Sequence, residues 1–124
     1  KSYILVALGG AIGSVSRFGI SELFTSQTNS SFPWATLLIN LLGCFLIGLL
    51  LGLSQRYQFA SHYSLRSFFI IGLCGGFTTF SSFSAETMRL FQNAQNFQAI
   101  MYILASTLIG LGLTLLGYNL LISR

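Results

Sequence analysis

The residues most suited to bind a ligand lie in one short stretch, which reads Gly-Gly-Phe-Thr-Thr-Phe-Ser-Ser-Phe-Ser from Gly75 to Ser84. Five hydroxyl side chains lie near the middle of an apolar segment. Each glycine weakens a helix by about 1 kcal/mol relative to alanine. A helix broken at membrane depth exposes backbone groups that commonly bind ions. The composition therefore favours an ion site. The alternative is a packing face of small residues, with Phe80 and Phe83 as ordinary core aromatics.

Two ionisable residues inside apolar segments are functional candidates, because such residues are costly in a membrane. Arg17 could attract anions at a pore mouth, or its side chain could extend to the interface. Glu86 could lie near an ion path or pair with Arg89 three residues later. We favour a structural role for Glu86.

Catalytic chemistry has no support in the sequence. Cys44 and Cys74 fall inside apolar segments, where free cysteine behaves as a small apolar residue. His62 stands alone in a connecting segment. No nucleophile is accompanied by a base and an orienting acid, so we predict that the protein is not an enzyme.

The composition predicts the fold that positions these residues. The chain has 124 residues, 53% hydrophobic and 6% charged, whereas a soluble domain is about 25% charged. We therefore predict an all-α membrane protein that forms a single integral membrane domain, residues 1–124. Four apolar stretches have the roughly 20 residues that a span requires, and their continuous apolar runs exclude an alternating barrel pattern. The predicted helices are approximately 3–23, 33–53, 65–91 and 97–122, the third broken near its middle.

The N-terminal segment resembles a signal peptide, but it lacks a clear cleavage site, so we interpret it as the first helix.

Basic residues indicate how the helices are oriented. Four basic residues are predicted on the side that carries both termini, and two lie nearer the other side: Lys1, Arg56, Arg66 and Arg124 against Arg17 and Arg89. The termini should be cytoplasmic. An excess of four to two is modest and permits insertion in both orientations.

The stretch from Gly75 to Ser84 closely resembles the signature of the Fluc/CrcB family of fluoride channels. Further segments agree with the family: Gly9-Gly10 followed by Arg17, Asn40-Leu41-Leu42-Gly43, and Glu86 after the signature. Four spans in a chain of this length also match, so the resemblance covers the whole chain. The resemblance implies a passive, highly selective channel that exports fluoride to relieve its toxicity. It also implies an antiparallel homodimer in the prokaryotic cell (inner) membrane. A structural, untransported sodium ion would be bound by the backbone carbonyls of Gly75 and Thr78.

Fluoride is only a hydrogen-bond acceptor, so donors must replace its water. The candidate donors carry amide or hydroxyl groups: Asn40, Ser81, Ser84, Ser106, Thr114 and Tyr102. A full positive charge in the path would bind the anion too tightly to conduct, whereas the edge of a phenylalanine ring is only weakly positive. Phe80 and Phe83 are three residues apart and share a helix face. The resemblance assigns both rings to the lining of the ion path.

The fourth predicted helix matches the family in part. Ser106, Gly110 and Thr114 are spaced four residues apart and share a face, where the family has a series of hydroxyls. Gly110 cannot donate from a side chain, so that step would need water or a backbone group. The hydroxyls of Ser106 and Thr114 could instead bond to carbonyls of their own helix.

Two other functions are weighed against the channel. A small multidrug-type proton-coupled transporter also has four helices, but it needs a carboxylate at membrane depth, and only Glu86 approaches that position. A non-transporting membrane assembly subunit would explain the apolar composition and the glycines. It would not explain why hydroxyls and phenylalanines cluster at the predicted break.

Overall fold

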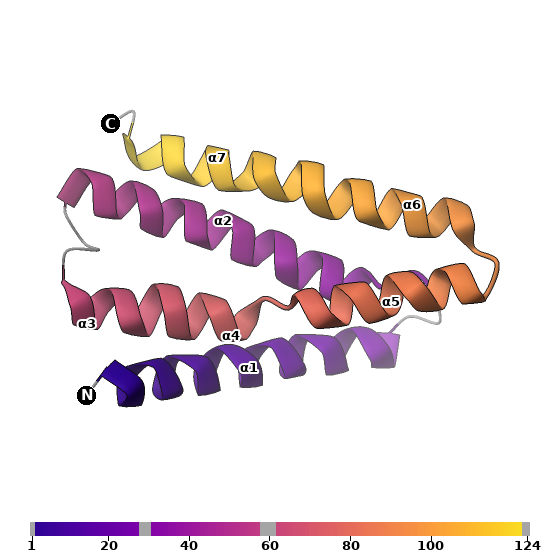
Figure 1. Cartoon of the computed structure of the whole chain (residues 1–124), viewed down its shortest axis with the longest axis horizontal. Coiled ribbons are helices and arrows are strands. Elements are labelled where there is room, and N and C mark those ends of the chain that lie inside the picture. The colour runs from indigo at the N-terminus through magenta and orange to yellow at the C-terminus, as the bar shows by residue number, and fades with distance from the viewer. Residues whose placement is uncertain (1, 28–30, 58–61, 123–124) are drawn as a thin grey trace.

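The computed structural model describes residues 2–27, 31–57 and 62–122, and it forms four long helical segments (Figure 1). The continuous apolar composition and the lack of internal proline allow each segment to stay helical until polar residues end it, apart from one interruption in the third segment. The elements are, in order, α1 (Ser2–Gln27), α2 (Trp34–Tyr57), α3 (Tyr63–Leu65), η2 (Arg66–Cys74), α4 (Gly75–Phe77), α5 (Phe80–Gln92), α6 (Asn96–Leu104), η3 (Ala105–Ile109) and α7 (Gly110–Ile122). The two η elements are π-helical, and no element of the described residues is a strand.

Four segments of the described chain are long and apolar enough to cross a membrane, as predicted: Ser2–Phe24, Trp34–Tyr57, Tyr63–Gln92 and Asn96–Ile122. The first two helices extend about four residues beyond the predicted ends. Polar residues after each apolar stretch therefore continue the helix by a turn, since a helix that leaves the apolar region can keep its hydrogen bonds in polar surroundings.

The spans run alternately in opposite directions, so the start of α1 and the end of α7 lie at the same end of the bundle (Figure 1). Arg56 at the end of α2 and Arg66 at the start of η2 lie at that end too. Arg56 Nη1 donates 3.1 Å to the carbonyl of Leu121, one of the last carbonyls of α7. Lys1 and Arg124, which were predicted on the same side, lie outside the described residues.

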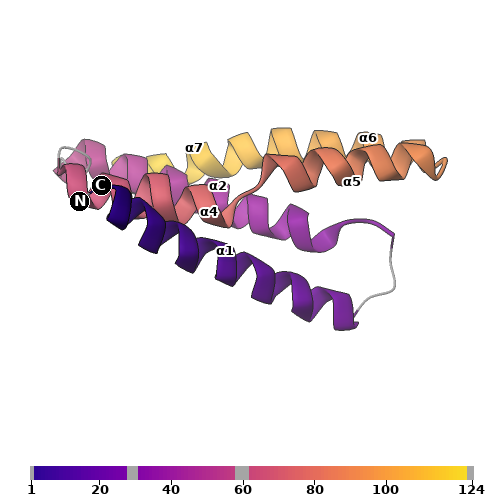
Figure 2. The same ribbon diagram turned by 60° about the horizontal axis from the view of Figure 1, so that its bottom comes forward.

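Glycines set how closely the helices approach. A β-carbon on Gly76 would lie 2.6 Å from the carbonyl oxygen of Gly10 in α1, and a β-carbon on Gly117 would lie 2.6 Å from the Phe45 carbonyl oxygen in α2. Backbones in contact at this range leave no room for a side chain, as is common between membrane helices. The fold thus consists of two tight pairs, α1 with η2 and α4, and α2 with α7. Figure 2 shows the far end of α1 diverging from the other helices.

Candidate functional site

The third span is interrupted at its middle, between α4 and α5. Thr78 (φ −87°, ψ 159°) and Thr79 (φ −150°, ψ 123°) are extended. The prediction of a broken helix is therefore confirmed, but the glycines do not form the break: Gly75 and Gly76 are still helical. The extended residues follow them, because the hydroxyl of Thr79 accepts a 3.2 Å bond from Ser82 N–H and so caps the start of α5.

Asn40 of α2 bonds to the backbone at this break. Its side-chain oxygen accepts from Thr79 N–H at 2.9 Å, and its amide nitrogen donates to the Thr79 carbonyl at 3.1 Å. A continuous helix would direct Thr79 N–H at the carbonyl of Gly75, four residues earlier. Asn40 therefore replaces helical hydrogen bonds inside the span, and one of its two amide protons remains for another acceptor.

Arg17 of α1 also bonds to the break. Its Nε donates to the Gly76 carbonyl at 3.3 Å, and the hydroxyl of Ser14 lies 3.5 Å from the same oxygen. The break releases this carbonyl from its helical partner, so a charged donor at membrane depth finds a fixed acceptor. The position of Arg17 is thus set by a backbone carbonyl of the third span.

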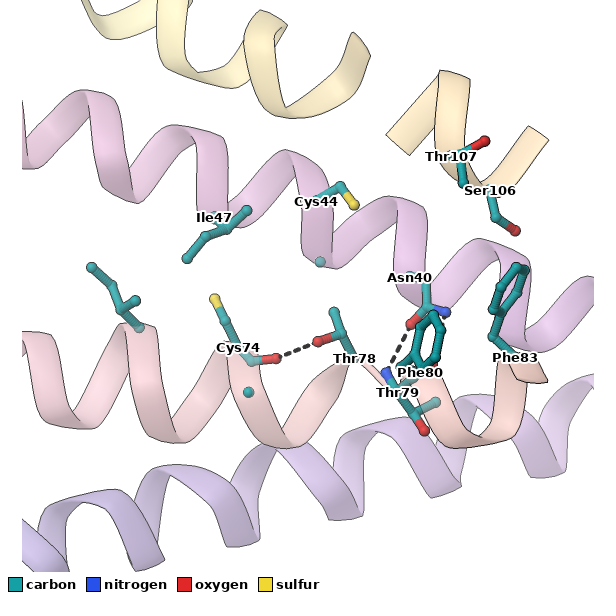
Figure 3. A pocket seen from close by; sticks show the side chains of 13 residues that line it. Asn40, Cys44, Ile47, Cys74, Thr78, Thr79, Phe80, Phe83, Ser106 and Thr107 are labelled. Carbon is teal, nitrogen blue, oxygen red and sulfur yellow. Dashed lines mark hydrogen bonds between the residues drawn. The ribbon is translucent and has the colours of Figure 1, made fainter. Parts of the chain in front are cut away.

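A pocket of about 440 Å³ lies beside the break, between α2, the third span and η3 (Figure 3). Its polar lining includes Asn40, both threonines of the break, Ser106 and Thr107, and its apolar lining includes Phe80 and Phe83. None of its lining residues is charged. The pocket offers hydrogen-bond donors and ring edges, which suits an acceptor without a countercharge.

Ser106 is the pocket residue whose hydroxyl lacks a hydrogen-bond partner. The oxygen is buried among the described residues and makes no bond. Its neighbour Thr107 instead donates to the carbonyl of Ile103 at 2.8 Å. Both residues lie in η3, and a π-helical turn within an α-helix frequently marks a functional site. A buried hydroxyl without a partner is costly, so Ser106 is the strongest indication that the pocket receives a ligand.

Phe80 and Phe83 lie together, as their spacing predicted, with ring centroids 5.7 Å apart. Both rings line the first pocket and also a second pocket of about 540 Å³. Ser84 lines the second pocket, together with Thr87. The two rings therefore lie where the two pockets meet, and Phe80 remains 78% exposed.

Glu86 is held by two hydroxyls from other helices. Thr36 Oγ1 donates to Glu86 Oε2 at 3.0 Å, and the hydroxyl of Tyr102 donates to Oε1 at 2.9 Å. Tyr102 is fully buried, and its ring lies 5.0 Å from that of Phe83. The favoured structural role of Glu86 agrees with this geometry, since the hydrogen bonds of its carboxylate join α5 to α2 and α6.

The other predicted donors lie outside the first pocket. Thr114 donates to the Cys44 carbonyl at 3.0 Å and to the Gly110 carbonyl at 3.1 Å. Its hydroxyl therefore joins α7 to α2, and the alternative of back-bonding is realised. Ser81 is exposed, with its hydroxyl 3.2 Å from that of Thr79. The structure thus groups Asn40, Ser106 and the two phenylalanines and places Thr114 and Ser81 elsewhere.

Sequence reasoning missed Thr36 and Thr107. Thr36 lies one helical turn before Asn40, so its place on the same face was available from the spacing. Its contact with Glu86 depends on how α2 packs against α5, which no local sequence pattern predicts.

Residues 4–118 match the family model described as CrcB-like protein, Camphor Resistance (CrcB). The chain belongs to the CrcB family. The match reaches from the first turn of α1 into the last turns of α7, so all four spans of this CrcB chain are included.

Relatives within the family align over nearly the full length of the chain. A protein of Thermus thermophilus is 48% identical over 97% of this chain and 94% of its own. Proteins of Azobacteroides pseudotrichonymphae (46% identical, over 97% and 95%) and Flavobacterium psychrophilum (42%, over 94% and 94%) are also similar. Each of the three is named a fluoride-specific ion channel FluC.

Proposed function

We propose that this chain forms a passive, highly selective fluoride channel. The observation that carries the proposal is the uncharged pocket at the break, where Ser106 has a buried hydroxyl without a partner and Asn40 retains an amide proton. Fluoride accepts hydrogen bonds and is small, so such donors can replace its hydration shell. The names of the relatives support this choice of ion.

The lining explains how an anion could pass without being trapped. No charged side chain lines either pocket among the described residues, so no countercharge would hold the ion. Phe80 and Phe83 lie between the two pockets and present weakly positive edges. The proposed path runs from the pocket at Asn40 and Ser106 past these rings to Ser84.

We further propose an antiparallel homodimer. Phe80 is 78% exposed although its ring lines both pockets, so one copy leaves the proposed path open on one side. A second copy packed over this face would enclose it. The modest excess of basic residues permits insertion in both orientations.

A structural sodium ion is proposed at the break. Thr79 N–H bonds to Asn40 and leaves the Gly75 carbonyl without that helical partner, and Gly75 is exposed with open space where a side chain would be. The described residues contain no group of three His, Cys, Asp or Glu side chains that could hold a metal. Carbonyl oxygens of Gly75 and Thr78, one pair from each subunit, are suitable ligands for a hard cation.

Exchange of sodium tests this site. Replacing sodium by a large organic cation on both sides of the membrane should lower the activity and the stability of the dimer. Unchanged flux and stability after prolonged exchange would exclude the ion.

The proposed setting is a prokaryotic inner membrane, where the channel would let fluoride leave the cell. Hydrogen fluoride is a weak acid that crosses membranes uncharged and dissociates inside. The alternative of a proton-coupled multidrug transporter has no supporting observation, since both carboxylate oxygens of Glu86 already accept hydrogen bonds.

The mode of transport is tested with purified protein in fluoride-loaded liposomes. We expect efflux that requires a potassium ionophore to balance charge and no proton gradient. Efflux that depends on a proton gradient would exclude a passive channel.

A further inference from the structure

Cys44 of α2 and Gly110 of α7 form one packing unit beside the pocket. A β-carbon on Gly110 would lie 3.2 Å from Cys44 Sγ, which is tighter than ordinary van der Waals contact. Gly110 is buried. The thiol therefore fills the space that a side chain at position 110 would need.

The thiol also belongs to the pocket wall. Cys44 lines the pocket and lies one helical turn after Asn40, on the same face of α2. Figure 3 shows its sulfur on the side of α2 that faces Ser106 and Thr107. The buried, unpartnered hydroxyl of Ser106 indicates independently that this wall meets a hydrogen-bond acceptor. A thiol is a weak hydrogen-bond donor.

We propose that Cys44 lines the anion path and supplies a donor at the level where α7 offers none at Gly110. The inference rests on the proposed function of the pocket. It extends that function to a cysteine that the sequence alone indicated to be a small apolar packing residue. It also makes the path sensitive to small thiol-reactive compounds.

Methyl methanethiosulfonate is a small reagent that would modify Cys44 by exchange at sulfur. The Cys44 thiol loses its proton to solvent, and its sulfur attacks the sulfenyl sulfur of methyl methanethiosulfonate. A disulfide to an S-methyl group forms, the sulfur–sulfur bond of the reagent breaks, and methanesulfinate leaves. The added group projects into the pocket, and dithiothreitol removes it by the reverse type of exchange.

Cys74 provides a matched control within the same pocket. It also lines the wall but is only 5% exposed, whereas Cys44 is partly exposed. Cys74→Ala leaves Cys44 as the single thiol, and Cys44→Ala leaves Cys74. Mass spectrometry measures the rate at which each single thiol in the liposome-reconstituted protein is modified.

We expect Cys44 to react faster than Cys74 and to be protected by fluoride about threefold more than by chloride at equal concentration. Modification of Cys74→Ala should lower fluoride efflux about tenfold, and dithiothreitol should restore it. Unmodified Cys44→Ser retains a hydrogen-bond donor, so it should lose less efflux than Cys44→Ala. Cys44→Ala, which loses the donor, should lower it about fivefold.

Two results would overturn the proposal. One is reaction of Cys44 no faster than that of Cys74, or equal protection by the two anions. The other is full efflux in Cys44→Ala or after modification of Cys74→Ala. Absence of fluoride efflux from the unmodified parent would count against the proposed function instead, and the relative labelling rates would still report whether Cys44 faces the pocket.

Discussion

Asn40 and Thr79 exchange two hydrogen bonds, in which the side-chain amide of one residue accepts from and donates to the backbone of the other, at 2.9 and 3.1 Å. The pair joins α2 to the break in the third span. The same side chain lines the pocket, so Asn40 both stabilises the break and offers its remaining proton to a ligand.

Asn40→Ala should therefore lower both stability and flux. Two backbone groups of Thr79 lose their partner, and each unsatisfied group costs about 1–3 kcal/mol. Asn40→Asp keeps the acceptor for Thr79 N–H, but it places a carboxylate oxygen against the Thr79 carbonyl and a negative charge in the pocket, so it should also lower stability and block flux. Denaturation in detergent and liposome efflux measure the two effects. Normal flux in either variant would remove Asn40 from the path.

Ser106 and Thr107 lie in the same pocket wall, but the Thr107 hydroxyl has a hydrogen-bond partner and the Ser106 hydroxyl has none. Ser106→Ala removes the unpartnered donor and should lower fluoride efflux about fivefold, with little loss of stability. Thr107→Val removes a hydroxyl already bonded to Ile103 and should leave efflux within about twofold. Equal efflux of the two variants would contradict the proposed role of Ser106.

Phe80→Ile and Phe83→Ile should depress efflux about tenfold or more, because isoleucine keeps apolar bulk but loses the ring edge. Phe97→Ile is the matched control, since Phe97 is as exposed as Phe80 (76% against 78%) and lines neither pocket. Core aromatics would behave differently: the variants would lose stability yet keep their flux per folded channel.

The hydroxyls around Glu86 should contribute to stability. Tyr102→Phe and Thr36→Val each remove one donor to the carboxylate, and we expect each to lower the free energy of unfolding by about 1–2 kcal/mol. Thr36→Ser keeps the hydroxyl and should retain most of the stability. Unchanged stability in both Tyr102→Phe and Thr36→Val would show that these bonds do not hold α2, α5 and α6 together.

The sequence predicted the four spans because their apolar length is sufficient by itself. It predicted the neighbouring rings of Phe80 and Phe83 because three-residue spacing sets a shared helix face. It predicted a break near the middle of the third span, but the glycines there remain helical: Gly76 packs closely against Gly10, and the chain becomes extended two residues later. Glycine composition indicates a weak or closely packed helix but does not distinguish the two.

Contacts between spans account for the other differences. Glu86 has Arg89 within reach along its own helix, yet Thr36 and Tyr102 hold its carboxylate. Thr114 shares a face with Ser106 by spacing, yet its hydroxyl bonds to the Cys44 carbonyl. These partners depend on how α2 packs against α5 and α7, and the periodicity of a single helix does not predict that packing.

The most direct test of the central claim is the ratio of fluoride to chloride efflux from liposomes that contain the purified protein, measured with a potassium ionophore and without a proton gradient. The donors at Asn40 and Ser106 and the ring edges at Phe80 and Phe83 predict rapid fluoride efflux with chloride efflux near the level of protein-free liposomes. Chloride efflux as large as that of fluoride would contradict the account.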